Sequence, residues 1–419
     1  MAYPAPKSVE SASKLRGEWR EGGYPTGTAP RAQREETSRR GSRHPTKKNK
    51  PSIALVYDWL TNMGGGEKLL LALHKAYPDA PIYTSVFIPE NCPPFAGLDI
   101  RTTYLQNLPK FLRRRHQLFP VLRAHAFRTL DLSKYDIVLS SASAEAKAVQ
   151  ARHDAAHICY CHTPTRYYWS HYKEYKKDPG FGRLNPLIRL VIPPFVAWMR
   201  KLDLKAVAGV DYFIANSHAV QARIKKYYKH DSSVIFPPVQ IERLQPKQPV
   251  AKADFYLVVG RQNSYKRTDI AIKACNQLKK RLIVIGKGDE HNNLLKLAGP
   301  TIEFMTNVDD KAVIAYFQQA KAFIFPQQDD FGITAVEAMA AGTPVIAYKK
   351  DGALDSVVDG TTGLFFAEQT TKSLVEAIKR FETLTFSTTV LQKHAEQFSE
   401  ERFIEQIHEF VEAHTKTAI

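Results

Sequence analysis

Residues 325–344 combine acidic side chains with a turn that can bind an anion. A strand is predicted to end at Phe325 and a short helix to begin near Gly332. The first N–H groups of a helix lack intrahelical partners and the helix dipole is positive there, so this turn suits a diphosphate. Glu337 falls about one turn into the helix, where a carboxylate can accept hydrogen bonds from the vicinal hydroxyls of a ribose. Taken singly, these residues favour an ordinary strand–helix unit; the complete string favours a binding site.

Two cations follow the next candidate strand, in the segment Gly260–Lys266. Arg261 can bind a phosphate through two parallel N–H groups, whereas Lys266 acts as a point charge. When a bond from a phosphate to a sugar breaks, negative charge grows on the phosphate, and fixed cations stabilise it most in the transition state. A lone arginine and lysine near a turn usually form solvated surface. Their place at a strand end, in the same half of the chain as the acidic helix, favours phosphate binding instead.

Two glycine-rich loops allow a ligand to approach the backbone closely. The first joins the first predicted strand to an apolar helix and contains Gly65 and Gly66. A tight turn without a ligand is the alternative there. The second loop contains Gly286 and Gly288, and it lacks the third glycine of a dinucleotide-binding fingerprint. Each loop is weak evidence by itself.

His162 lies at the end of a predicted strand, at the start of the string His-Thr-Pro-Thr-Arg-Tyr-Tyr-Trp. A single histidine is more often a packed or surface residue than a catalytic one. The complete string, which also contains Arg166 and Trp169, favours a functional role for His162.

The string from Asp329 to Glu337 resembles the signature of glycosyltransferase family 4, in which two acids separated by seven residues flank a Phe-Gly-Ile turn. The resemblance implies that Glu337 binds the nucleotide ribose. It implies that Asp329, where the family usually has the longer glutamate, contacts hydroxyls of the donor sugar. It also assigns donor binding to the backbone of the turn, formed by Phe331, Gly332, Ile333 and Thr334.

Other segments resemble elements of the same family. Gly260–Lys266 is similar to its G-R-x4-K element, which implies that Arg261 and Lys266 hold the donor diphosphate. The loop with Gly286 and Gly288 resembles the one that lines the base pocket, and the loop with Gly65 and Gly66 resembles the one that faces the diphosphate. Residues 162–169 look like the H-T-P-x-R-Y-x-W segment of bacterial mannosyltransferase-like members that assemble surface polysaccharide. That likeness places His162 beside the donor sugar, and Arg166 and Trp169 on the acceptor side.

Apolar runs of strand length alternate with amphipathic segments from Ser52 onward, which predicts an α/β protein with doubly wound parallel sheets. The resemblance implies the GT-B fold, with two Rossmann-like domains that face each other across a cleft. The predicted strands are 53–57, 82–86, 137–140, 158–161 and 212–215, then 256–259, 282–285, 302–304, 323–325 and 345–347. The predicted divisions are a disordered basic tail (1–50), an acceptor domain (51–245), a donor domain (246–395), and a C-terminal helix (396–419) that packs back toward the acceptor domain.

The composition fits an enzyme whose ligands carry phosphate. The 419 residues have a net charge of +17, with 44% hydrophobic and 24% charged residues. A basic surface suits nucleotide diphosphates or anionic lipids, and no interleaved aromatic and basic motif points to nucleic acid. Cys159 and Cys161 form a Cys-x-Cys pair, but no second cysteine pair completes a metal site, so free thiols and no metal are expected.

Two basic and apolar stretches predict contact with an anionic membrane: residues 109–130 and 183–205. Buried helices with cationic ends are the alternative. The sequence has neither an apolar secretory signal nor a run of about 18 uncharged apolar residues. We therefore expect a cytoplasmic protein, with peripheral binding at the inner face of the plasma membrane as a further expectation.

The resemblance implies a retaining glycosyltransferase that transfers a hexose from a nucleotide sugar to a glycan or lipid-linked glycan. The first expectation is mannose from GDP-mannose. A UDP-sugar enzyme, an epimerase or phosphorylase of the same fold, and a catalytically inactive nucleotide-sugar-binding subunit are alternatives. No residue is an obvious nucleophile with a paired acid, so we expect same-face displacement in which the leaving phosphate accepts the acceptor's proton. No cofactor or metal is required in that scheme, because the cations and the helix N-terminus neutralise the phosphates.

Overall fold

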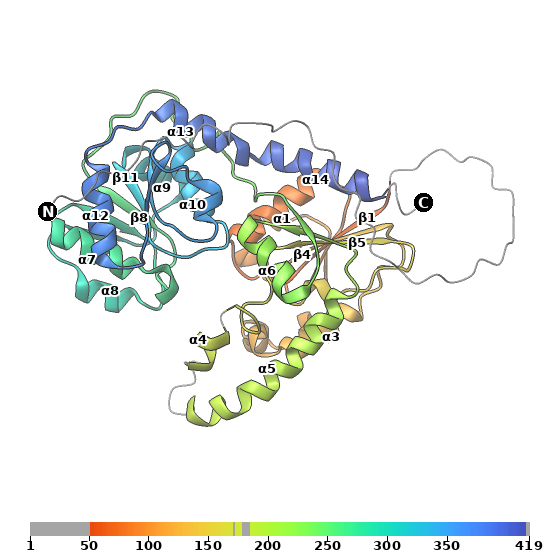
Figure 1. The fold of residues 1–419 in the computed structure, drawn as a ribbon. Coiled ribbons are helices and arrows are strands. Elements are labelled where there is room, and N and C mark those ends of the chain that lie inside the picture. Colours follow the sequence, from red (N-terminus) through yellow and green to blue (C-terminus); the bar gives the residue numbers. More distant parts are fainter. Residues whose placement is uncertain (1–50, 171, 178–184, 416–419) are drawn as a thin grey trace, which may run out of the picture. The chain divides into compact units, whose positions relative to one another are not determined.

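The computed structural model describes residues 51–170, 172–177 and 185–415, which form two parallel α/β halves (Figure 1). The predicted tail at 1–50 lies outside the described residues, as do residues 183, 184 and 416–419 of other predicted segments. Every strand pair is parallel, as expected for strands that alternate with helices. The predicted fold class is therefore confirmed.

Each half has one sheet. The first is ordered β3-β2-β1-β4-β5-β6-β7 and the second β10-β9-β8-β11-β12-β13. The first comprises β1 (Ile53–Tyr57), β2 (Ile82–Thr84), β3 (Ile100–Thr102), β4 (Ile137–Ala142), β5 (Ala156–Cys161), β6 (Tyr212–Ala215) and β7 (Ser232–Val234). The second comprises β8 (Tyr256–Val259), β9 (Leu282–Ile285), β10 (Ile302–Met305), β11 (Ala322–Phe325), β12 (Val345–Tyr348) and β13 (Gly363–Phe366).

Both sheets reverse their strand order in the middle, between β1 and β4 and between β8 and β11. In such sheets a ligand binds outside the carboxyl ends of the strands at the point of reversal. The loops after β8 and β11 carry the segments 260–266 and 326–332, which contain the predicted phosphate and sugar residues. The topology thus brings two distant motifs to one edge of the second sheet.

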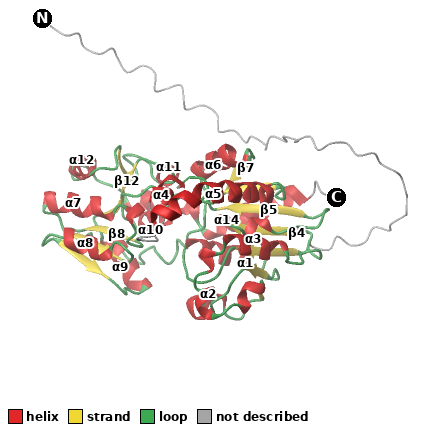
Figure 2. Cartoon of the chain, turned by 90° about the horizontal axis from the view of Figure 1, so that it is seen from below, coloured by secondary structure: helices red, strands yellow, loops and turns green. Residues whose placement is uncertain are grey.

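Helices cover both faces of each sheet (Figure 2). The helices of the first half are α1 (Gly65–Ala76), α2 (Lys110–Arg113), α3 (Pro120–Arg128), α4 (Tyr172–Lys177), α5 (Asn185–Val207) and α6 (His218–Tyr228). Those that follow are α7 (Thr268–Leu278), α8 (His291–Leu297), α9 (Asp310–Gln319), α10 (Ile333–Ala340), α11 (Ala353–Ser356), α12 (Thr371–Phe381), α13 (Thr388–Ala395) and α14 (Glu400–Thr415). In the second half, α9, α10 and α13 pack on one face of the sheet and α7, α8 and α12 on the other.

All ten predicted strands are present, and three strands were not predicted. Each of the three, β3, β7 and β13, lies at the edge of its sheet. An edge strand has one neighbour and is less enclosed; every residue of β3 and β7 is only partly buried. The apolar run that identifies a strand buried on both faces is therefore absent from β3 and β7, whereas β13 is apolar and mostly buried, so this reason does not apply to it.

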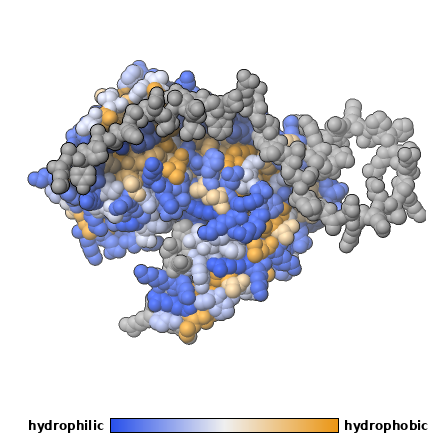
Figure 3. Space-filling model, viewed as in Figure 1, coloured by the Kyte–Doolittle hydropathy of each residue, from blue (hydrophilic) through white to orange (hydrophobic). Residues whose placement is uncertain are grey.

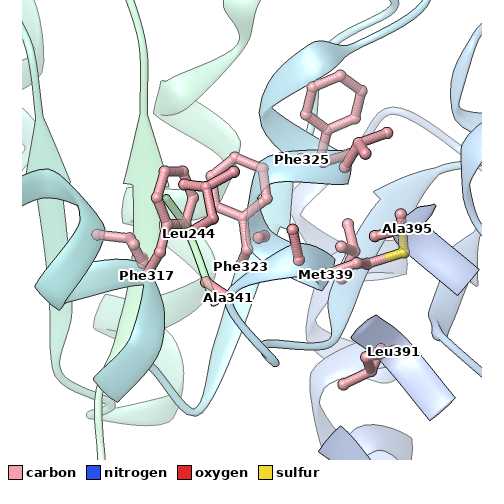
Figure 4. Packing of buried hydrophobic residues seen from close by; sticks show 14 of the residues in the cluster. Leu244, Phe317, Phe323, Phe325, Met339, Ala341, Leu391 and Ala395 are labelled. Atoms are coloured by element: carbon pink, nitrogen blue, oxygen red, sulfur yellow. The ribbon is translucent and has the colours of Figure 1, made fainter. Parts of the chain in front are cut away.

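A compact core supports the loop after β11 (Figure 4). Phe323 of β11 packs edge-on against Phe317 of α9, with their ring centroids 5.4 Å apart. Met339 of α10 and Leu391 of α13 belong to the same cluster and are fully buried. The end of β11 and the first turn of α10 therefore stand on rigid packing.

The chain passes from the first sheet to the second through residues 235–255, where the sequence analysis places a boundary at residue 245. That boundary stays a prediction. The chain returns near Phe398, whose carbonyl accepts a 2.9 Å hydrogen bond from the Val239 N–H. Beyond it, α14 packs on α1: His408 Nε2 lies 2.9 Å from the Ala76 carbonyl oxygen, and Phe403 joins the core of the first sheet.

Candidate functional site

The loops after β8 and β11 meet through an ion pair. Lys266 Nζ lies 2.6 Å from Asp329 Oδ2, and each side chain is about one-fifth exposed. The two residues are 63 positions apart in the chain. Arg261 lies on the same loop as Lys266, and its side chain is exposed. Two predicted cations and one predicted acid thus lie together at the reversal point of the second sheet.

The first turn of α10 begins at Ile333, four residues after Asp329, at the end of the same loop. Gly332 precedes the helix with φ +88°, a left-handed conformation that glycine adopts without strain. Phe331 turns its ring away into the core, where it stacks on Phe236 at 5.5 Å. Ile333 and Thr334 begin the helix and are half-buried. Packing of the phenylalanine therefore fixes the turn whose amides are free to bind an anion.

Glu337 lies one turn further along α10 and has its own cations. Lys68 Nζ lies 3.2 Å from Glu337 Oε1, and Arg243 Nη2 lies 3.7 Å from the same oxygen. These residues line a pocket of about 270 Å³ between α1 and α10. The carboxylate is 11% exposed, so it is accessible at one side only. A buried carboxylate at the rim of a pocket can accept hydrogen bonds from ligand hydroxyls.

The glycine-rich loop of the first half lies against this part of the second half. A Cβ atom on Gly65 would lie 3.0 Å from Ile333 Cδ1, and one on Gly64 would lie 3.8 Å from Arg261 Nη2. At Gly66 the space for a side chain is filled by the Tyr57 hydroxyl, so packing alone accounts for that glycine. Gly65 is thus placed beside the first turn of α10, whereas the lack of a side chain at Gly66 leaves room for the Tyr57 hydroxyl.

A buried acid accompanies this loop. Glu67 is 8% exposed and accepts a 3.0 Å hydrogen bond from the Tyr57 hydroxyl. Burial raises the pKa of Glu67, although nearby groups including Arg261 act in the opposite direction. The acid therefore faces Arg261 without forming a close ion pair with it, which leaves the guanidinium available for an anionic ligand.

The two glycines of the predicted base-pocket loop allow the loops after β8 and β9 to approach each other closely. A Cβ atom on Gly286 would lie 2.2 Å from the Gly260 carbonyl oxygen, and one on Gly288 would lie 2.5 Å from the Gln262 carbonyl oxygen. Gln262 is 1% exposed and donates a 2.7 Å hydrogen bond to the Gly286 carbonyl. Nothing in the local sequence singles out Gln262, whose side-chain amide braces the loop that carries Arg261.

His162 follows β5 and belongs to the carboxyl edge of the first sheet. Its Nε2 lies 2.8 Å from the Ser141 hydroxyl. Burial lowers the pKa of His162 to about 4, while the charges of Asp58 and Asp330 act in the opposite direction. The imidazole is therefore neutral near pH 7 and suits hydrogen bonding to a hydroxyl better than proton donation. The charges that act on its pKa also include that of Arg166, which lowers it further.

Asp330 was missed by the sequence analysis, although it stands directly beside Asp329. It is 8% exposed and forms ion pairs with Arg166 and Arg223 of the first half. Burial alone would raise the pKa of Asp330, but the two guanidiniums hold it below its usual value. The sequence did contain a signal for Asp330, because it is a second acid in the same string as Asp329. Arg223, which also pairs with Asp351, has no such signal in the sequence.

Asp58 is a second acid that the sequence analysis missed, directly after β1 at the reversal point of the first sheet. One oxygen accepts hydrogen bonds from the N–H groups of Ser143 and Ala144, at 2.6 and 2.9 Å, and the other from Ala146 at 2.8 Å. Asp58 is 2% exposed, and these hydrogen bonds hold the loop after β4 in place. Its place directly after a buried strand was the signal.

The predicted site residues do not all meet. Lys266 and Asp329 touch, and Gly65 lies beside Ile333, but Glu337 forms a separate cluster with Lys68 and Arg243. Cys159 and Cys161 are buried free thiols. Within residues 51–415, apart from the gaps at 171 and 178–184, no group of three metal-binding side chains occurs.

Two family models match the chain. The model described as Glycosyltransferase Family 4 matches residues 63–243, and that described as Glycosyl transferases group 1 matches residues 240–402. Together they span both halves of the fold, including the loops that meet at Lys266 and Asp329. The match extends from the glycine-rich loop of the first half to the start of α14.

Two mannosyltransferases are similar in sequence. The human alpha-1,3/1,6-mannosyltransferase ALG2 is 28% identical over 242 residues, which cover 48% of this chain and 58% of that protein. The chain thus spans little more than half the length of the human relative. The mouse protein of the same name is 22% identical over 419 residues, which cover 86% of this chain and 96% of that protein.

A solved structure shares the fold. The Anabaena protein HepE, in complex with UDP and glucose, superposes with a TM-score of 0.63. The superposition covers 87% of this chain and all of HepE at 18% identity. This likeness shows the GT-B fold.

Proposed function

Because this chain belongs to glycosyltransferase family 4, we propose that it is a retaining hexosyltransferase that moves mannose from GDP-mannose to a lipid-linked glycan or polysaccharide. One observation carries the proposal of a nucleotide-sugar donor. Lys266, Asp329 and the free N–H groups of α10 lie together at the carboxyl edge of the second sheet, at its reversal point. Cations and helix N–H groups suit a diphosphate, and a carboxylate suits sugar hydroxyls.

The geometry supports a division of roles within this site. Arg261, Lys266 and the first turn of α10 would hold the diphosphate, and Glu337 the ribose. Gly286 and Gly288 would line the base pocket. Asp329 and the neutral His162 would bind sugar hydroxyls. The phosphate that leaves would be stabilised by fixed cations, and it would accept the proton of the attacking hydroxyl, because none of the site residues named here is a nucleophile with a paired acid. This scheme requires no metal or further cofactor.

The choice of GDP-mannose depends on two likenesses. Residues 162–169 resemble the segment of mannosyltransferase-like family members, and the human and mouse relatives are named mannosyltransferases. HepE holds UDP and glucose in the same fold, which favours a UDP-sugar as the second candidate. The two candidates share a diphosphate that links a nucleoside to a hexose; they differ in the base and in the configuration of the sugar hydroxyls.

A competition experiment tests the donor. The purified protein and a membrane extract would be offered GDP-mannose, UDP-glucose and UDP-N-acetylglucosamine, each labelled in the sugar. We expect label from GDP-mannose in the glycan or lipid fraction, with α stereochemistry. Turnover of a UDP-sugar without use of GDP-mannose would refute the donor and leave the transferase proposal standing.

Replacement of Glu337 by glutamine should weaken donor binding. The amide keeps the volume but loses a charge-assisted hydrogen bond to the ribose, which costs about 1.5–3 kcal/mol, or roughly 10- to 150-fold in Kd. Calorimetry with GDP and UDP measures the change. Glu303→Gln is the matched control, because Glu303 is an exposed acid on β10 that also pairs with a cation, Arg281. This control should leave donor binding unchanged. If affinity falls only together with cooperative unfolding, Glu337 is structural.

We further propose that α5 contacts an anionic membrane, where a lipid-linked acceptor would be found. Leu190, Val191 and Trp198 are 76%, 57% and 45% exposed and lie along one stripe of the helix. Basic residues flank that stripe, including Arg189 and Lys201. Figure 3 shows hydrophobic atoms among hydrophilic ones in this region. Within the described residues, no helix is long and apolar enough to cross a membrane.

Vesicle sedimentation tests this contact. We expect the protein to bind vesicles that contain phosphatidylglycerol, and to bind pure phosphatidylcholine vesicles at least tenfold more weakly. Leu190→Glu with Val191→Glu should abolish binding, because two charges would enter the headgroup region. Leu354→Glu alters an apolar side chain that is 51% exposed on α11 and should change nothing. Equal binding by all variants would refute the role of α5.

A further inference from the structure

Three cations and two adjacent aspartates form a continuous chain of ion pairs beside the proposed donor site. Lys266 Nζ lies 2.6 Å from Asp329 Oδ2, and Arg166 Nη2 lies 3.9 Å from Asp329 Oδ1. The same nitrogen of Arg166 binds Asp330, which also binds Arg223. Asp329 therefore has one cation in close contact and a second one held just outside hydrogen-bond distance.

The partners of Arg166 hold it in this position. Asp330 is buried and receives both guanidiniums, so it is a firmly held anchor. Arg223 also donates a 3.4 Å hydrogen bond to Thr163, in the string that carries Arg166. A guanidinium has five N–H donors in a rigid fork, so its contact with Asp330 leaves donors for a second carboxylate.

Lys266 cannot serve two anions equally. The proposed function, on which this inference rests, assigns Lys266 to the donor diphosphate. The diphosphate of a nucleotide sugar carries two negative charges, one on each phosphate, whereas a carboxylate carries one, so the diphosphate attracts the ammonium more strongly at the same distance. A lysine that turns toward the diphosphate leaves Asp329 without its close partner, at the moment when this carboxylate must face the sugar.

We propose that Arg166 is a positioning residue of the transfer reaction, which replaces Lys266 as the partner of Asp329 when the donor binds. One oxygen of Asp329 would be held by the guanidinium while the other accepts a hydrogen bond from a sugar hydroxyl. The arginine comes from the first half and the aspartate from the second, so the arrangement forms only where both halves meet. Asp329 is one methylene shorter than the family's usual glutamate, which leaves room for the guanidinium beside it.

The variant Arg166→Gln tests the proposal in the full chain, with the donor that the wild type turns over. We expect kcat to fall roughly 30-fold, because one charge-assisted hydrogen bond is lost in the transition state. The donor KM and the affinity for GDP and UDP should change less than about threefold, because Arg261 and Lys266 still hold the diphosphate. Arg166→Lys should recover part of kcat.

Arg152→Gln is the matched control. Arg152 also pairs with two aspartates, Asp136 and Asp154, but it precedes β5 at the opposite edge of the first sheet. This variant should leave kcat unchanged. A loss of kcat equal to that of Arg166→Gln would show that any broken arginine pair slows the enzyme, and would overturn the inference.

A double-mutant cycle with Asp329→Asn separates positioning from general structure. In the Asp329→Asn background, Arg166→Gln should lower kcat less than about threefold further, because the interaction is already absent. Equal losses in both backgrounds would overturn the inference. So would a fall in GDP and UDP affinity as large as that caused by Lys266→Ala, since Arg166 would then be a phosphate ligand. A wild type that turns over none of the three donors would instead refute the proposed function, and this role with it.

Discussion

Arg261→Ala and Lys266→Ala should each lower kcat/KM for the donor by about 10³-fold. Both cations would neutralise charge that grows on the leaving phosphate, and removal of one such preorganised group typically costs about 3–4 kcal/mol in the transition state. The affinity for GDP and UDP should also fall, by at least about tenfold, because the product diphosphate carries the same charge. Steady-state kinetics and calorimetry measure the two effects.

The fold should survive both changes. Arg261 is exposed, and Lys266 and Asp329 are each about one-fifth exposed, so the loss of this ion pair should cost about 1 kcal/mol or less of unfolding free energy. Lys273→Ala and Arg281→Ala remove surface cations of the same half that pair with Asp269 and Glu303. These two controls should keep full activity. Unchanged diphosphate affinity in both site variants would remove the phosphate assignment.

Gly286→Ala should destroy the site through the backbone. Gly286 has φ +124°, where an L-residue is strained, and an added Cβ would lie 2.2 Å from the Gly260 carbonyl oxygen. The loops after β8 and β9 would have to separate, which also breaks the Gln262 hydrogen bond to Gly286. We expect a loss of about 3 kcal/mol or more of unfolding free energy, and at least about 100-fold in GDP and UDP affinity.

Gly360→Ala provides the control for backbone strain. Gly360 also has a positive φ, +74°, but no atom lies within 4 Å of an added Cβ. Its replacement should cost only about 1 kcal/mol from the left-handed conformation. Urea denaturation of both variants isolates the clash at Gly286. Equal losses of stability would mean that the close approach of the two loops is not required.

The central strands of each sheet were predictable from the sequence, because a strand that is covered on both faces must be apolar throughout. β6, β8 and β9 have the bounds that their apolar runs predict. The acid–turn–acid string at 329–337 and the Arg–Lys segment at 260–266 could also be identified from the sequence, because each is local and follows a strand. The edge strands β3 and β7 were not predicted, since one-sided contact leaves no such requirement on composition.

The sequence by itself determined where the central strands and the phosphate motifs lie, because those features depend on residues within about twenty positions of one another. Only the tertiary structure decided which charges meet. Arg166 and Asp330 are 164 positions apart, and Lys68 and Glu337 are 269 apart. An ion pair at such separation depends on the packing of two complete sheets, and any exposed arginine or lysine has the same local pattern. The cations that the first half brings to Asp330 and Glu337 could therefore be identified only once both halves of the protein were in place.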